Sequence, residues 1–100
     1  MQTHPRKLLT IITEGVIERP LIDDCRRLGA QGHTVMDVRG GGVHGRREGA
    51  WEADRSIELQ LVCTEEVAER IAAHVLAQYA PHYAMALYLA DVQVFRAAKY

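Results

Sequence analysis

The sequence has few of the residues that mark membrane, nucleic-acid-binding and disulfide-stabilised proteins. Its 100 residues include two cysteines, three prolines, one tryptophan and one phenylalanine, and the formal net charge is −1. No apolar run approaches the roughly 20 residues of a membrane-spanning helix, and residues 1–7 lead into a strand-like segment rather than a signal peptide. A pI near 6.5 argues against a protein that coats nucleic acid. We therefore expect a cytoplasmic protein with no nucleic-acid partner and no direct membrane insertion.

Recognisable metal, redox and catalytic motifs are also missing. Cys25 and Cys63 lie far apart without a Cys-x-x-Cys spacing, which favours two buried reduced thiols over a disulfide or a metal site. The five histidines form no metal-ligand spacing. The Gly40-x4-Gly45 segment lacks the lysine and the Ser/Thr of a P-loop, and no potential nucleophile has a nearby base in the sequence. We expect no metal, no cofactor and no enzyme activity.

The hydrophobic pattern predicts four strands and two helices in one domain over residues 1–100. Residues 8–12 form a compact apolar run typical of a central strand. Apolar residues at steps of three and four predict a helix from 17 to 28 and a second one between Thr64, its N-cap, and Pro81. Further strands are predicted at 34–38, 56–63 and 85–95, and a slip in apolar phase around Ala90-Asp91 indicates a bulge in the last strand.

This element order predicts an α+β fold. The ferredoxin-like βαββαβ arrangement places two helices on one face of a four-stranded antiparallel sheet, with a long loop here between the second and third strands. Glu58, Gln60 and Val62 give the third strand a mixed polar and apolar face that suits packing against copies of the same chain. Because a chain of this length has a limited core, we expect an oligomer.

The run from Asp37 to Arg47 predicts a ligand-binding loop. Five of the eight glycines fall between Gly40 and Gly49, and a basic pair follows directly after the glycine-rich stretch. Glycine lets backbone N–H groups turn toward an anion, and arginine offers a planar fork to phosphate or carboxylate oxygens. His44 is the one histidine that could donate to such an anion. The alternative is a solvent-exposed hairpin tip without a ligand.

Three motifs resemble the PII signalling superfamily. They are Thr13-Glu14 at the end of the first strand, Gly29-x-x-Gly32-x-Thr34-Val35 before and into the second, and Asp37-Val38-Arg39-Gly40-x-Gly42 at the loop. The resemblance covers the element order from Lys7 to about Phe95 and is closest to the PII-like proteins linked to inorganic-carbon uptake and carboxysomes. It implies a homotrimer that binds adenine nucleotides in clefts between subunits, and a long T-loop (residues 40–54) that changes shape with the ligand.

The resemblance also assigns binding residues. Thr34 and Glu58 match positions near the adenine and ribose, and the backbone of Gly40, Gly41 and Gly42 matches the phosphate site. Basic groups would come from Arg46 and Arg47 in the T-loop and from Arg96 and Lys99 near the C terminus. The residues assigned to a bicarbonate ion beside the phosphates are Gly41, His44, Arg46 and Arg47.

Departures from the PII pattern shape the expected function. The T-loop has no tyrosine at its tip for nucleotidylation, and Val43-His44 replaces the glutamine after the glycines. Residues 80–83 lack the glycine and lysine that help to hold ATP, which favours ADP or AMP as the ligand. The resemblance therefore implies a regulator of inorganic-carbon uptake or carboxysome function whose partner is a bicarbonate transporter or a carboxysome component. The alternative is a trimeric ferredoxin-like metal-handling protein or small enzyme.

Overall fold

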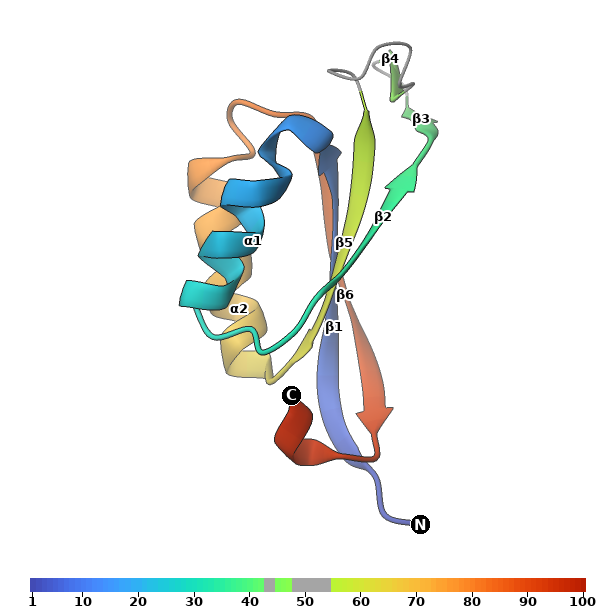
Figure 1. Cartoon of the computed structure of the whole chain (residues 1–100), viewed down its shortest axis with the longest axis vertical. Coiled ribbons are helices and arrows are strands. Elements are labelled where there is room, and N and C mark those ends of the chain that lie inside the picture. The colour runs from blue at the N-terminus through green and yellow to red at the C-terminus, as the bar shows by residue number, and fades with distance from the viewer. Residues whose placement is uncertain (43–44, 48–54) are drawn as a thin grey trace.

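A four-stranded antiparallel sheet with two helices on one face forms the body of the protein (Figure 1). The computed structural model describes residues 1–42, 45–47 and 55–100, with side chains described outside 41–54. The strand order is β2-β5-β1-β6. The four strands are β1 (His4–Glu14), β2 (Thr34–Val38), β5 (Ser56–Cys63) and β6 (Met85–Val94), and the helices are α1 (Glu18–Arg27) and α2 (Glu65–Gln78). This arrangement confirms the predicted ferredoxin-like fold.

Short elements complete the chain. A 3-10 turn, η1 (Gly15–Ile17), joins β1 to α1, and a second one, η3 (Ala97–Lys99), follows β6. The T-loop includes two three-residue strands, β3 (Gly40–Gly42) and β4 (Gly45–Arg47), which pair with each other and not with the main sheet. In Figure 1 this ribbon lies at one end of the sheet, while η3 and both chain termini lie at the other.

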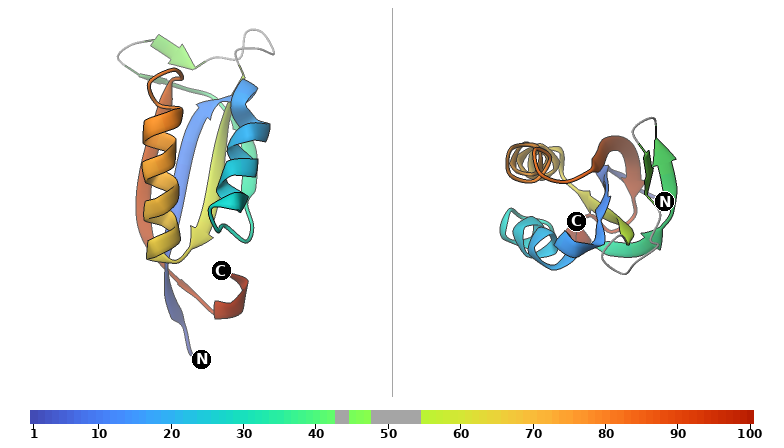
Figure 2. Two further views of the ribbon diagram at one scale, coloured as in Figure 1. Left: turned by 90° about the vertical axis from the view of Figure 1, so that its left-hand side faces the viewer. Right: turned by 90° about the horizontal axis from the view of Figure 1, so that it is seen from above.

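The core lies between the sheet and the two helices (Figure 2). Leu9 and Ile11 of β1 are fully buried on the helix side and pair with Leu61 and Leu59 of β5. Alternation along the strands directs these residues to one face. The helices complete the core with Leu21 and Cys25 from α1 and with Ala68, Ile71 and Val75 from α2. Among the residues that the structure describes, no helix covers the opposite face of the sheet (Figure 1).

Local signals in the sequence explain the helix boundaries. The Thr64 hydroxyl accepts a hydrogen bond from the Val67 N–H at 3.3 Å, which confirms the predicted N-cap of α2. At the end of α1, Gly29 has a φ of 123°. There the Ala30 N–H donates to the Cys25 carbonyl at 3.0 Å and the Gly29 N–H to the Arg26 carbonyl at 3.1 Å, the bonding pattern of a Schellman motif. The turn directs residues 30–33 back toward β2.

The predicted bulge in β6 is wrong. β1 and β6 pair without a slip from His4↔Val94 to Thr13↔Met85. Polar residues appear in β6 where the strand passes beyond the first turn of α2, so the change in apolar phase marks the end of the helical cover and not a change of register. Asp91 there forms an ion pair with Lys7.

Both cysteines are free and buried, as predicted. Burial is the main cause that raises the pKa of the Cys25 thiol to about 12, so its reactive thiolate is scarce at neutral pH. In the part of the chain that is described, no helix combines the length and the apolar character needed to cross a membrane.

Candidate functional site

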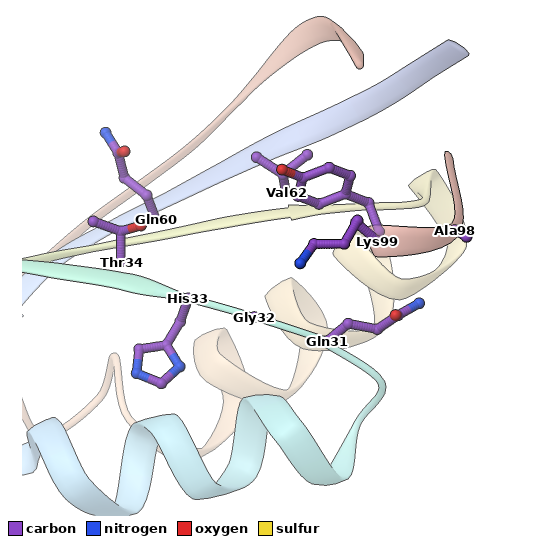
Figure 3. A pocket seen from close by; sticks show the side chains of 9 residues that line it. Gln31, Gly32, His33, Thr34, Gln60, Val62, Ala98 and Lys99 are labelled. Atoms are coloured by element: carbon purple, nitrogen blue, oxygen red, sulfur yellow. The ribbon is translucent and has the colours of Figure 1, made fainter. Parts of the chain in front are cut away.

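A hollow of about 420 Å³ lies where the start of β2 meets the C-terminal turn (Figure 3). We call it the C-terminal pocket. Three segments distant in sequence form its walls: the connection after α1, the middle of β5, and η3 with the residue after it. The lining residues are Gln31, Gly32, His33, Thr34, Gln60, Val62, Ala98, Lys99 and Tyr100.

The sheet register sets the polar groups of this pocket. Thr34 pairs with Gln60 across β2 and β5, and Figure 3 shows both side chains on the same side of the sheet. His33, the preceding residue, points to the other side, toward α1 (Figure 3). The pocket therefore presents a hydroxyl and an amide side by side, next to the apolar side chain of Val62.

Glu58 does not line the pocket, but it is hydrogen-bonded to Gln60, which does. It pairs with Met36 in β2, and its Oε2 accepts a hydrogen bond from Gln60 Nε2 at 2.8 Å. This bond fixes the Gln60 amide so that its carbonyl oxygen is turned away from Glu58 and can accept a hydrogen bond elsewhere. Glu58 thus acts on the pocket through Gln60, a residue that the sequence reasoning did not assign to the site.

Positive charge reaches the pocket from the C-terminal turn. Lys99 lines it together with Tyr100, and both also line a second hollow of about 350 Å³ that is shared with the end of β6. Arg96 lines that second hollow. Two of the predicted basic residues therefore lie at the C-terminal turn, Arg96 just before η3 and Lys99 as its last residue, and Lys99 lines the same pocket as Thr34. A hydroxyl, an amide, an apolar surface and a cation are groups that can bind a planar base with an anionic substituent.

The predicted phosphate site lies elsewhere in the chain. Gly40 pairs with Arg47, Gly41 with Arg46, and Gly42 with Gly45 in the β3–β4 ribbon. His44 lies outside the described residues, as do the side chains of Arg46 and Arg47. A Cβ atom added at Gly40 would meet no atom within 4 Å, so no contact among the described residues requires glycine at this position.

The two groups of predicted residues are separated within one chain. Thr34 begins β2, whereas Gly40 lies six residues farther along an extended backbone, a span of roughly 20 Å at about 3.3 Å per residue. Figure 1 shows the β3–β4 ribbon and η3 at opposite ends of the sheet. A single chain therefore brings Thr34 and Lys99 together but does not bring the glycine backbone to them.

The base of the T-loop is fixed by a residue that the sequence reasoning missed. Arg55 Nη1 donates to Asp37 Oδ1 at 2.9 Å and Nη2 to Glu18 Oε1 at 3.3 Å. The Arg55 carbonyl accepts from the Gly15 N–H at 2.6 Å. The hydrogen bond to Asp37 is the main cause that raises the pKa of Arg55 above its ordinary value. These contacts join residues on both sides of the T-loop to η1 and to the start of α1.

A polar cluster between the helices has a different role. Asp24 Oδ2 accepts from the Tyr79 hydroxyl at 2.6 Å and lies 2.9 Å from His74 Nε2. Partial burial opposes ionisation of Asp24, but hydrogen bonds from Tyr79, His74 and Arg27 outweigh it and lower the pKa of the carboxyl. The cluster joins α1 to α2 away from the C-terminal pocket. No group of three or more His, Cys, Asp or Glu residues in the described chain could hold a metal ion.

Comparison with known proteins extends over nearly the whole chain. Residues 6–99 match the family described as nitrogen regulatory protein P-II. The structure of a protein from Thermus thermophilus, described as PII-like signalling, is 40% identical with a TM-score of 0.87 and covers 100% of this chain and 99% of its own. CPII from Thiomonas intermedia K12, bound to ADP and bicarbonate, is 27% identical with a TM-score of 0.88 over 98% and 96% of the two chains. CPII bound to ADP, AMP and bicarbonate is 28% identical with the same TM-score over 98% and 95%.

Proposed function

Because the chain belongs to the nitrogen regulatory P-II family, we propose that it is a regulatory protein that binds ADP or AMP together with bicarbonate in clefts between the subunits of a homotrimer. The resemblance to PII-like proteins drawn from the sequence is confirmed by the family match and by the likeness to CPII. The proposal extends to this chain the ligands that are bound in the structures of CPII from Thiomonas.

The observation that carries the proposal is the separation of the two half-sites. The C-terminal pocket holds Thr34 and Lys99, whereas the glycine backbone of β3 lies at the other end of β2. One nucleotide can contact both groups if the β3 end of one subunit meets the C-terminal pocket of its neighbour. Each cleft of a closed ring of subunits would then receive one half-site from each of two chains.

The uncovered sheet face supports assembly with copies of the same chain. Its side chains include Leu8, Ile12, Met36, Val62 and Tyr88, and Tyr88 is 53% exposed in the single chain. Apolar side chains that are exposed together on one face often mark a surface that contacts another protein. Packing this face against neighbouring subunits would add to the small core of a 100-residue chain.

Each half-site has a distinct role in the proposed cleft. Thr34, with Glu58 acting through Gln60, would bind the adenine and ribose. Lys99 and Arg96 would approach the phosphates from the C-terminal side, and the neighbour's glycine backbone would approach them from the T-loop side. The phosphates would be bound on that side by Gly40, Gly41, Gly42, Arg46 and Arg47, and the bicarbonate by Gly41, His44, Arg46 and Arg47.

Signalling would follow from the position of the T-loop. An ion pair joins Asp37 and Arg55, which flank the T-loop, so ligand binding at β3 would act within a segment whose two sides are held together. A change in the population of T-loop conformations would alter contact with a partner in the cytoplasm, either a bicarbonate transporter or a carboxysome component. A role in inorganic-carbon uptake accords with the bicarbonate bound in the CPII structures.

A metal-handling protein or small enzyme is the less favoured alternative. Such a protein would need a chelating or catalytic cluster, and the described side chains provide none that could hold a metal. Cys25 is buried and its pKa is raised, so it is a poor nucleophile. The alternative would regain support if the purified protein bound no adenine nucleotide.

Equilibrium titration tests the proposed function. AMP, ADP, ATP and cyclic AMP are titrated with and without bicarbonate, and light scattering gives the mass of the same sample. We expect a trimer that binds ADP or AMP more tightly when bicarbonate is present. The Lys99→Ala variant should bind about 10-fold more weakly, since it loses a charge-assisted contact, while Arg26→Ala on the exposed face of α1 is the matched control. A monomer, or a trimer without nucleotide affinity, would contradict the proposal.

A further inference from the structure

The hydrogen bonds that join the C-terminal segment (residues 96–100) to the body of the protein come from one side chain. Arg6 Nη2 donates to the Ala97 carbonyl at 3.1 Å, and Arg6 Nε donates to the Tyr100 carbonyl at 3.3 Å. Within the ranges that the structure describes, no other hydrogen bond joins this segment to an earlier part of the chain. The attachment therefore spans nearly the full length of the sequence, from the first strand to the last residue.

The internal hydrogen bonds of the segment are few. The Lys99 N–H donates to the Arg96 carbonyl at 3.0 Å, and the Tyr100 N–H donates to the Ala97 carbonyl at 3.2 Å. A 3-10 helix as short as η3 does not sustain its conformation alone, because forming the first turn fixes several dihedral angles for one hydrogen bond. The position of the segment thus depends on contacts with the rest of the protein.

Arg6 is suited to this task by its geometry. It lies in β1 opposite Val92 of β6 and is half-buried. All three of its side-chain nitrogens donate to backbone carbonyls, since Nη1 also donates to the Pro5 carbonyl at 2.8 Å. A planar guanidinium can serve several carbonyls at fixed angles, whereas a lysine ammonium on a flexible stem cannot reproduce this fork. Arg6 is therefore committed to the backbone and not directed at a ligand.

The segment that Arg6 holds is one wall of the C-terminal pocket. Ala98, Lys99 and Tyr100 line the pocket opposite Thr34 and Gln60. We infer that Arg6 is a positioning residue for nucleotide binding, which fixes the C-terminal segment so that Lys99 and Tyr100 face the pocket without Arg6 touching the nucleotide. This inference rests on the proposed function.

Hydrogen exchange without ligand tests the anchor. In Arg6→Ala the amides of Lys99 and Tyr100 should exchange about 10-fold faster, because a segment without its attachment opens more often. Amides of α1 and β5 should not change, and the denaturation midpoint shows whether the variant is folded. Arg26→Ala, an exposed arginine of α1, is the matched control and should exchange as the wild type does. Unchanged exchange at both amides in a folded Arg6→Ala would overturn the inference.

Nucleotide titration tests the consequence for binding. We expect Arg6→Ala to bind ADP about 10-fold more weakly, and Arg6→Lys to recover only part of this loss although it keeps the charge. Full recovery in Arg6→Lys would overturn the inference, since charge alone would then be sufficient.

A double-mutant cycle separates positioning from other effects. If Arg6 acts through Lys99, then Arg6→Ala should cost much less affinity in a Lys99→Ala background than in the wild type. Additive losses, or wild-type affinity in Arg6→Ala, would overturn the inference but leave the proposed function standing. A wild-type protein that bound no nucleotide would instead refute the proposed function and the binding half of the inference, while the exchange experiment would still decide whether Arg6 is the anchor.

Discussion

Replacing Gly29 by alanine should destabilise the protein by about 1–3 kcal/mol, a common range for a strained substitution. The residue has a φ of 123°, which L residues rarely adopt. An alanine Cβ there would lie 3.1 Å from Val67 Cγ2 on α2. The backbone term alone costs roughly 1–2 kcal/mol, and the close contact adds to it. The smaller entropy of the unfolded alanine chain offsets about 0.4–1 kcal/mol of this cost.

Urea denaturation at fixed protein concentration measures the effect, because the stability of an oligomer depends on concentration. Gly32→Ala is the matched control, since a Cβ there would meet no atom within 4 Å and the backbone has no positive φ. It should be neutral or slightly stabilising. The reasoning would be refuted if Gly29→Ala were as stable as the wild type, or if both variants lost the same free energy of unfolding.

Three further predictions concern the helix contacts and the T-loop. Asp24→Asn should lower the free energy of unfolding by about 1 kcal/mol at pH 7. Because the pKa of Asp24 is depressed in the folded state, this deficit should disappear as the pH falls below the ordinary pKa of an aspartate, near 4. Urea denaturation from pH 7 to 2, with Asp23→Asn as control, would refute the assignment if the deficit persisted in acid. Thr64→Ala should cost about 0.5–2 kcal/mol by removing the cap of α2, and a thermal midpoint equal to that of the wild type would count against the cap. Arg46→Ala or Arg47→Ala should weaken nucleotide or bicarbonate binding by roughly 10- to 150-fold without unfolding the protein, whereas unchanged affinities in both variants would exclude these side chains from the site.

The fold could be predicted from the sequence because its signals are local. Thr64 and the apolar spacing after it define α2, and the alternation from Ser56 to Cys63 defines β5. The bulge at Ala90-Asp91 was predicted wrongly for a physical reason. A single sequence shows where apolar residues stop, but not whether the strand has slipped or has passed the end of the helix that covers it.

The candidate site was only partly predictable, because its contacts join distant segments. Thr34 and Lys99 were both assigned in advance, and they line one pocket. Gln60 and Glu58 lie two residues apart and therefore on the same face of β5. Only the register of β2 against β5 shows that Gln60, and not Glu58, lies opposite Thr34. No local motif marks Arg6 or Arg55, because their hydrogen-bond partners are distant in the sequence. Arg6 bonds to Ala97, 91 residues away, and Arg55 bonds to Asp37, 18 residues away.

The central claim is that each nucleotide cleft combines half-sites from two chains, and mixed oligomers test it most directly. Gly41→Val, which adds bulk at the glycine backbone, and Lys99→Ala should each bind ADP weakly when expressed alone. When the two variants are co-expressed and assemble at random, about a quarter of the clefts should pair an intact Gly41 with an intact Lys99 from the neighbouring subunit. ADP titration of the mixture should then show that fraction of sites with wild-type affinity. A mixture that recovers no wild-type sites would contradict the shared cleft.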